Sequence, residues 1–506
     1  MNPLKNLFFF LLIILYFFSI SACQAQNNIE PPNSWKTSTP EEQGMDSRDL
    51  LEMLDFIESS GEDIHSVLII RNGYLVLEAY YYPYNPQIKH MQASATKSFT
   101  STLFGIAIDK GCIPGVEEKV LDFFPDYTFE NNDDLKQSMQ LKHPLTMSSG
   151  LNWSKTEGND NPESVFFTKD DPVQYTIDRP MTAKPGTVWT YSGGDSHLLA
   201  AIIQKSTGKK MLDFAKQNLF DPLEFSNYFW EEHSRSGVNI GCAGLYIRPR
   251  DMAKLGYLYL NQGKWNGKSI VSSEWIKQAS TRLPYKDYGY QFWIDPELGL
   301  YKAWGYGGQH IAVLPDLNIV VVFTGGVVDG SLYPFHRKLY KDYIIQSVKS
   351  SQPLSEKPEI QREIEERISN ISKGPEPKKV KTIPMIAKEI SDRKYKLESN
   401  TFDFKSFSLE FNEEKSEGTI DLVFSFIKGE FPIGLDNVYR TKKIKLYGTP
   451  IALRGSWIDS NSFEFELLNV VFGYKYYFIC HFENKAVKVD ASSPILKMKE
   501  TINGKR

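Results

Sequence analysis

An Asn-Gly pair, Asn72-Gly73, constrains the fold of this chain more than any other local feature. It joins residues 65–71 to residues 74–81, two runs rich in β-branched and aromatic residues. Asn-Gly between such runs is the pattern most typical of a tight β-hairpin. The segment before them, residues 47–60, has apolar residues at helical spacing. The folded part of the chain therefore opens with a helix and two antiparallel strands.

Further strands are predicted only much later in the chain. Residues 116–275 read mainly as helix and loop. Short aromatic or β-branched runs separated by Pro-Asp or Gly-rich turns then follow at residues 288–294, 301–304, 310–314 and 319–324, before a helix over 334–350. Strands at both ends of a segment with helices between them imply one antiparallel sheet built from both ends, with a helical part alongside. This is an α+β architecture, and we assign it to residues 39–350.

The pattern changes after residue 350. Residues 351–384 are rich in Glu, Lys and Pro and contain a charged helical run, so we interpret them as a charged linker. Residues 385–506 then alternate with period two, and strands are predicted at residues 402–411, 419–427, 443–446, 451–457, 462–470, 474–482 and 486–489. This predicts a C-terminal all-β domain, either a barrel or a sandwich.

The N-terminus carries an export signal. Lys5 precedes an apolar run over residues 7–18, which is too short for a permanent membrane anchor and is typical of a signal peptide. Small residues directly before Cys23 resemble a bacterial lipobox, so residues 1–22 are predicted as a lipoprotein signal peptide and Cys23 as the lipidated residue. Residues 23–38 would be a flexible tether. The alternative is an ordinary secretory signal cut nearby, for instance after Ala25. Either reading predicts an exported protein, in the periplasm or cell envelope, that meets the membrane only through an N-terminal lipid.

Composition excludes several classes of partner and cofactor. The net charge of −4 over 506 residues argues against nucleic acid as a partner. Three cysteines remain besides Cys23, namely Cys112, Cys242 and Cys480, and no C-x-x-C spacing occurs, so we interpret them as buried small residues. The eight histidines show no metal-ligand spacing. We therefore expect no metal and no organic cofactor.

The strongest chemical motif is Ser94-Ala95-Thr96-Lys97, which opens an amphipathic stretch from 94 to 110. If this stretch is a helix, Ser94 and Lys97 lie on one face and an amine stands beside a hydroxyl. Serine is a poor nucleophile without a neighbouring base, and a lysine whose pKa is lowered by burial or by other cations can serve as that base. The unpaired N–H groups of a first helical turn can stabilise a developing oxyanion.

Three further segments add candidates to this pair. Tyr191 lies in a Pro-Gly-x-x-Trp-x-Tyr-Ser loop just before an apolar helix, where a neighbouring lysine can lower the pKa of its phenol. Residues 304–309 read Trp-Gly-Tyr-Gly-Gly-Gln, and their glycines allow a strand edge to approach a ligand. Residues 241–252 form a Gly-rich turn that leads into a helix. Each segment alone is a weak signal.

In this order and spacing, the motifs resemble the serine hydrolase family of class C β-lactamases, penicillin-recognising DD-peptidases, related esterases and 6-aminohexanoate-oligomer hydrolases, over about residues 39–348. The resemblance implies a β-lactamase/transpeptidase-like fold. It implies Ser94 as the acylated nucleophile, with Lys97 and Tyr191 as its acid-base pair. It also implies an oxyanion hole formed by the backbone N–H groups of Ser94 and Tyr306. The substrate contacts implied by the same strand are Trp304, Gly305, Gly308 and Gln309.

Two departures from the family pattern bear on substrate. Gly193 stands where penicillin-recognising members have asparagine, and no Lys-Thr-Gly sequence occurs. These losses favour an esterase or amidase acting on a small-molecule or peptide-like substrate, nearer to the 6-aminohexanoate-oligomer branch. Two alternatives stay open. One is a β-lactam-recognising or sensory lipoprotein with little or no turnover, and the other is a true β-lactamase.

Overall fold

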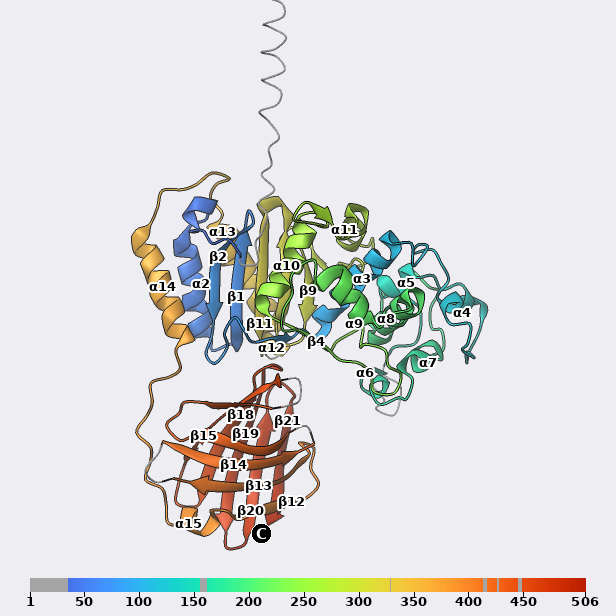
Figure 1. The fold of residues 1–506 in the computed structure, drawn as a ribbon. Helices are drawn as coiled ribbons and strands as arrows, with labels where there is room; N and C mark the ends of the chain where they lie inside the picture. Colours follow the sequence, from blue (N-terminus) through green and yellow to red (C-terminus); the bar gives the residue numbers. More distant parts are fainter. Residues whose placement is uncertain (1–34, 155–161, 328, 413–415, 426, 445–447) are drawn as a thin grey trace, which may run out of the picture.

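The computed structural model has two parts, a helix-covered sheet domain and a C-terminal barrel (Figure 1). It describes residues 35–154, 162–327, 329–412, 416–425, 427–444 and 448–506. The predicted signal peptide, Cys23 and most of the predicted tether lie outside these residues. No helix within the described ranges is long and apolar enough to cross a membrane.

The first part is organised around a six-stranded antiparallel sheet in the order β2-β1-β11-β10-β9-β8. Its strands are β1 (Ile64–Arg71), β2 (Tyr74–Tyr80), β8 (Trp293–Asp295), β9 (Leu300–Gly305), β10 (Gln309–Leu314) and β11 (Ile319–Gly325). β1 pairs with β2 through the Asn72-Gly73 turn and with β11 on its other edge. Both predictions, the hairpin and the single sheet assembled from distant segments, are confirmed.

Helices cover both faces of this sheet (Figure 1). One face is covered by α2 (Ser47–Ser60), α12 (Asp329–Lys338), η6 (Leu339–Ile344) and α13 (Ile345–Ser347). The other face is covered by α10 (Pro249–Leu260) and α3 (Thr96–Asp109), and α8 (Gly193–Thr207) packs on α3. α2 has the predicted bounds. The helix predicted from Pro334 instead begins at Asp329, with Pro334 inside it, because a proline marks a helix start in sequence without requiring one.

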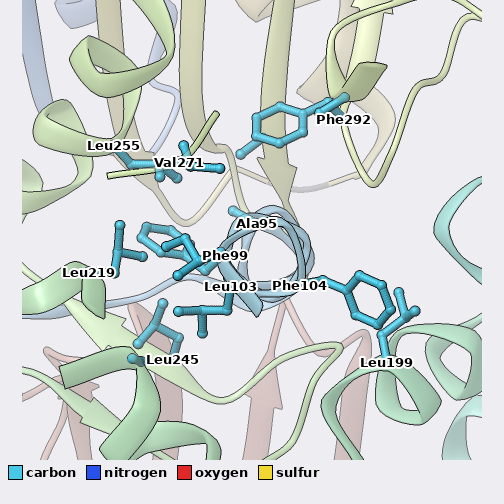
Figure 2. Packing of buried hydrophobic residues seen from close by; sticks show 14 of the residues in the cluster. Ala95, Phe99, Leu103, Phe104, Leu199, Leu219, Leu245, Leu255, Val271 and Phe292 are labelled. Atoms are coloured by element: carbon cyan, nitrogen blue, oxygen red, sulfur yellow. The ribbon is translucent and has the colours of Figure 1, made fainter. Parts of the chain in front are cut away.

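α3 is the central helix of the domain and not the amphipathic one that the sequence suggests. Phe99, Leu103 and Phe104 point from it in different directions into the core (Figure 2). Its polar residues are buried as well, because their hydroxyls donate to carbonyls of neighbouring segments: Ser98 to Gln291 at 2.7 Å and Ser101 to Tyr290 at 2.8 Å. Satisfied hydroxyls can be buried at little cost, so the polar stripe does not mark an exposed face.

Shorter elements complete the first part. They are η1 (Glu41–Gln43), β3 (His90–Met91), η2 (Ala93–Ala95), η3 (Val120–Phe123), α4 (Asp134–Gln137), α5 (Lys142–Leu145), α6 (Pro162–Phe166), α7 (Pro172–Ile177), α9 (Met211–Ala215), η4 (Lys216–Phe220), β4 (Phe229–Trp230), β5 (Leu245–Ile247), β6 (Lys264–Trp265), β7 (Lys268–Ser269) and α11 (Ser273–Ala279).

The segments on either side of the predicted hydrolase domain also pack on it. Trp35 is buried in the core and donates from Nε1 to the carbonyl of Arg250 at 3.4 Å, so the described end of the predicted tether packs on the domain. The predicted linker contains α14 (Pro358–Ser372), which packs on α2 and buries Ile360 and Ile364. After α14 the chain continues without regular structure to α15 (Ile386–Ile390).

The C-terminal domain is a closed barrel, which decides between the two predicted all-β forms. Nine strands form the ring in the order β15-β14-β13-β12-β21-β20-β19-β18-β17, and a parallel pairing of β15 with β17 closes it. The strands are β12 (Tyr395–Leu397), β13 (Phe404–Phe411), β14 (Glu417–Phe424), β15 (Lys428–Gly434), β16 (Arg440–Lys443), β17 (Pro450–Trp457), β18 (Ser462–Asn469), β19 (Tyr474–Glu483), β20 (Ala486–Ser493) and β21 (Met498–Lys505). β12, β15 and β21 were not predicted, because β12 is short, β15 contains Gly and Pro, and β21 is strongly polar.

Candidate active site

Ser94 and Lys97 meet where the short turn η2 leads into α3. Nζ of Lys97 donates to Oγ of Ser94 at 3.2 Å and to the carbonyl oxygen of Cys242 at 3.0 Å. Lys97 is buried, whereas Ser94 is partly exposed. Ala93, just before the serine, has φ of 45°, a value that costs energy for a residue with a Cβ. Sharp turns of this kind present a nucleophile to a cleft, so the predicted pair is brought together at an accessible position.

The charge state of Lys97 depends on the groups around it. Burial favours the neutral amine, but attraction to the surrounding acidic groups, Tyr191 first and Glu163 among them, outweighs burial and raises the pKa of Lys97 above its ordinary value. The sequence left the resting protonation of Lys97 open. A raised pKa favours the ammonium form, and an ammonium group beside Ser94 can stabilise negative charge.

Tyr191 joins this pair from the loop before α8. Nζ of Lys97 lies 4.7 Å from the centre of the Tyr191 ring. The loop is held on both sides of the tyrosine, because the N–H of Thr190 donates to the carbonyl of Met147 at 2.8 Å and Oγ of Ser192 accepts from the N–H of Asp195 at 3.0 Å. Ser192 is thereby the N-cap of α8. The structure thus gathers an alcohol, an ammonium group and a phenol that are far apart in the sequence.

The carboxylate of Glu163, a residue that was not predicted from the sequence, lies close to Lys97 and Gly193. Glu163, on α6, accepts from the N–H of Gly193 at 2.6 Å and from Nε1 of Trp153 at 3.1 Å. A Cβ at Gly193 would come within 2.2 Å of Oε2 of Glu163. Glu163 therefore fills the space that an asparagine side chain would take. No motif in the sequence marks this glutamate, and only its distant partner Gly193 gave a signal.

The end of β9 packs against the nucleophile turn. A Cβ on Gly305 would lie 2.2 Å from the carbonyl oxygen of Gln92 and 3.1 Å from the nitrogen of Ala95, so only glycine allows this approach. Gly307 and Gly308, with φ of 80° and 94°, then turn the chain into β10. Tyr306 stands at the start of this turn, next to the η2 turn that carries Ser94. This is the placement expected for the second oxyanion donor.

Gln309 lies in a different environment from the one expected of a substrate ligand. Its side chain is 1% exposed. Nε2 donates to the carbonyls of Tyr306 at 3.0 Å and Gly325 at 2.8 Å, and Oε1 accepts from the N–H of Gly325 at 3.3 Å. Both ends of the amide are thus engaged by backbone groups, and Gln309 supports the glycine turn.

A wall of aromatic rings runs from Tyr191 along the edge of the sheet. The Trp293 ring lies 5.8 Å from Tyr191, 5.8 Å from Trp189 and 5.3 Å from Trp304. Trp189, Trp293 and Trp304 are only half-buried. Trp304, predicted as a substrate contact, also packs on the α12-covered face of the sheet, 6.2 Å from the Tyr333 ring, and Trp293 lies in a short strand that carries no sequence motif. Such rings suit the apolar part of a substrate.

The remaining candidates are the cysteines and the side chains that could bind a metal. Within the described ranges, no group of three His, Cys, Asp or Glu side chains could hold a metal ion. Cys112, Cys242 and Cys480 are free thiols, with Cys242 and Cys480 buried and Cys112 half-buried. Burial raises the pKa of the Cys242 thiol to about 12, so this thiol stays protonated beside Lys97 and is not a competing nucleophile.

Comparison with known proteins agrees with this geometry. The model of the Beta-lactamase family matches residues 64–325. An uncharacterised protein of Alkalihalophilus pseudofirmus is 23% identical over 314 residues, which are 53% of this chain and 84% of the relative. The 6-aminohexanoate-dimer hydrolase of Paenarthrobacter ureafaciens is 21% identical over 277 residues, which are 50% of this chain and 70% of that enzyme. The crystal structure of a family VIII carboxylesterase, 14% identical, matches with a TM-score of 0.50 over 61% of this chain and 98% of its own, which shows a shared fold. This chain therefore belongs to the beta-lactamase family.

Proposed function

We propose that this protein is a serine hydrolase that cleaves an ester or amide through an acyl-enzyme on Ser94. The observation that carries the proposal is the 3.2 Å hydrogen bond from Nζ of Lys97 to Oγ of Ser94, with the Tyr191 ring 4.7 Å from the same nitrogen. A nucleophile held against a cation and a phenol is the arrangement that activates serine.

In the first step, Oγ of Ser94 attacks the substrate carbonyl and gives up its proton to the Lys97–Tyr191 pair. The oxyanion accepts hydrogen bonds from the N–H groups of Ser94 and Tyr306. Tyr191 returns the proton to the leaving alcohol or amine as the C–O or C–N bond breaks. In the second step, water attacks the acyl-enzyme, Tyr191 takes its proton, and Oγ of Ser94 recovers a proton as the acid leaves.

The substrate we propose is a linear ester or amide with an apolar part. Its support is the half-buried aromatic wall next to Tyr191 and the absence, in this sequence, of the Lys-Thr-Gly and of the asparagine that hold β-lactams in relatives. The relatives named for 6-aminohexanoate dimers and carboxylic esters favour the same classes.

A fluorophosphonate probe and a chromogenic short-chain ester test the activity together. Wild type is expected to label and to turn over the ester, whereas Ser94→Ala does neither. Ser101→Ala, which alters a serine on the same helix outside the site, is the control and should behave as wild type. Labelling of Ser94→Ala would contradict the proposal. Labelling of wild type without turnover of a panel of esters, amides and D-amino-acid peptides would favour the non-turnover sensor, and rapid cephalosporin hydrolysis would favour a β-lactamase.

We also propose that the protein is an exported lipoprotein anchored at Cys23, since an apolar run and small residues precede this cysteine. Metabolic labelling with an alkyne fatty acid should tag the wild type and not Cys23→Ala. Retention of the label by this variant would contradict the proposed anchor.

A further inference from the structure

Two neighbouring loops of the barrel reach the segments that carry the proposed catalytic groups. They are the β18–β19 loop, residues 470–473, and the β20–β21 loop, residues 494–497. The end of the barrel that carries these loops faces the sheet domain (Figure 1). Nothing in the chemistry of Ser94, Lys97 and Tyr191 requires a second domain, so the purpose of these contacts needs an explanation.

The first contact is made by the proposed oxyanion turn itself. The hydroxyl of Tyr306 donates to the carbonyl of Ile495 at 2.6 Å. The side chain of Ile495 also lies over the next residue of the turn, because Cδ1 would be 3.6 Å from a Cβ on Gly307. The side chain of Tyr306 is thus tied to the barrel, while its backbone N–H is the proposed oxyanion donor.

The second contact is made just before the nucleophile. The N–H of Met91 donates to the carbonyl of Val471 at 2.8 Å, and Met91 lies three residues ahead of Ser94. Met91 and Val471 form a small buried cluster with Tyr246, whose ring lies 5.3 Å from that of Phe472. The same β18–β19 loop therefore supports β3 and β5, the strands that frame the η2 turn.

The third contact is an ion pair between the two domains. Nζ of Lys475 and Oδ1 of Asp63 are 2.6 Å apart, and the other oxygen of Asp63 lies 3.3 Å from Nε2 of His65. Although burial opposes ionisation, His65 and Lys475 together hold the pKa of Asp63 well below its usual range, so this charge persists at neutral pH. The carbonyl of Asp63 also accepts from the N–H of Gly326 at 2.7 Å, directly after β11.

We infer that the barrel is a positioning element of the active site, which orients the N–H of Tyr306 toward the oxyanion through the bond from the Tyr306 hydroxyl to Ile495. The inference rests on the proposed function, since it assigns a role within the same site. Two N–H donors stabilise an oxyanion much less when one of them rotates away from it. Displacements of about 1 Å at catalytic sites change the reaction rate by up to about a hundredfold. Loops that only joined the two domains would not need to contact both the strand just before Ser94 and the turn that carries Tyr306.

The test compares two tyrosine-to-phenylalanine variants at the same interface. Tyr306→Phe removes the hydroxyl that reaches Ile495. Tyr82→Phe removes another interdomain hydroxyl, which donates to the carbonyl of Tyr439 at 3.5 Å and lies outside the catalytic segments. We expect Tyr306→Phe to lower kcat and the fluorophosphonate labelling rate about tenfold at unchanged KM, with a thermal midpoint close to that of Tyr82→Phe. Tyr82→Phe should keep the wild-type kcat.

A second variant covers the case in which Tyr306→Phe is poorly folded. Ile495→Ala keeps the Tyr306 hydroxyl but removes the side chain that lies over Gly307, and it should lower kcat several-fold without a change in KM. If Tyr306→Phe and Ile495→Ala both retain wild-type kcat and labelling rates, the positioning role is overturned while the hydrolase proposal stands. If Ser94→Ala is as active as wild type, the proposed function itself fails.

Discussion

Gly193 and Glu163 exclude any larger side chain at position 193. The N–H of Gly193 donates to Oε1 of Glu163 at 2.6 Å, and a Cβ added to Gly193 would lie 2.2 Å from Oε2 of the same carboxylate. Trp153 donates to Oε1 from the other side at 3.1 Å. This glutamate also adds to the attraction that keeps Lys97 charged. The missing asparagine is therefore replaced by a carboxylate from another segment and is not simply lost.

Restoring asparagine should be harmful in this chain. Gly193→Asn would displace the carboxylate of Glu163 and break its hydrogen bond to the N–H of residue 193, a charge-assisted bond worth about 1.5–3 kcal/mol. We expect a lower free energy of unfolding in urea and a several-fold lower kcat/KM for a short-chain ester. The introduced asparagine and the Glu163 carboxylate would compete for the same space. The double variant Gly193→Asn/Glu163→Ala should therefore lose less stability and activity than the sum of the losses of the two single variants. Additive losses in the double variant would contradict this competition.

The raised pKa of Lys97 predicts the pH dependence of acylation. With its pKa above the ordinary value near 10.4, the ammonium persists across the neutral and mildly alkaline range. If the cation is the active form, the labelling rate with a fluorophosphonate should not rise as Lys97 begins to lose its proton, and it should fall only above about pH 10. Lys97→Met should lower that rate by about a thousandfold or more. A rate that keeps rising through pH 10 would instead mean that the neutral amine is the base.

A substitution of Gln309 tests whether its side chain supports the glycine turn at residues 305–308 or contacts the substrate. Gln309→Leu would remove the hydrogen-bond partner of the Tyr306 carbonyl and of the N–H and carbonyl of Gly325. Each such buried group costs about 1–3 kcal/mol. We therefore expect a lower free energy of unfolding and a lower kcat with little change in KM. A selective increase in KM at unchanged stability would show that Gln309 contacts substrate after all.

Local patterns in the sequence were sufficient for most of the sheet and for the motif residues. The Asn72-Gly73 turn, helix α2 and the assembly of one sheet from both ends of the domain follow from hairpin chemistry and from runs of apolar residues. In the same way the motif spacing brought Ser94 and Lys97 together, because three residues on a helix span one turn.

What the sequence did not reveal depends on contacts between distant segments. The burial of α3 on every side requires carbonyl partners almost two hundred residues away. The charge of Lys97 is set by Tyr191 and Glu163, which approach only in the folded chain. The closure of the barrel likewise depends on the pairing of β15 with β17, which no local pattern encodes.

Lys302 is a buried lysine, and its removal should raise the free energy of unfolding. It lies on β9 with its Nζ 5.2 Å, 5.6 Å and 5.7 Å from the ring centres of Trp304, Tyr333 and Tyr340, and burial lowers its pKa to about 8 although Asp295 partly opposes this shift. The unfolded chain holds the same proton up to about pH 10.4, so below pH 8 the folded state bears the cost of a buried cation. That cost is relieved as the pH rises from about 8 to about 10.

Lys302→Met should therefore raise the free energy of unfolding at pH 7. The pKa difference corresponds to at most about 3 kcal/mol, and the loss of contacts between the ammonium and the rings reduces the gain to about 1–2 kcal/mol. Urea unfolding at pH 7 and pH 10 should show this gain shrinking with rising pH, because wild type alone becomes more stable in that range. Lys341→Met, at an exposed lysine of η6, is the matched control and should change stability little at either pH. A gain for Lys302→Met that is equal at both pH values would contradict a buried ammonium group, since only the titrating amine links this position to pH.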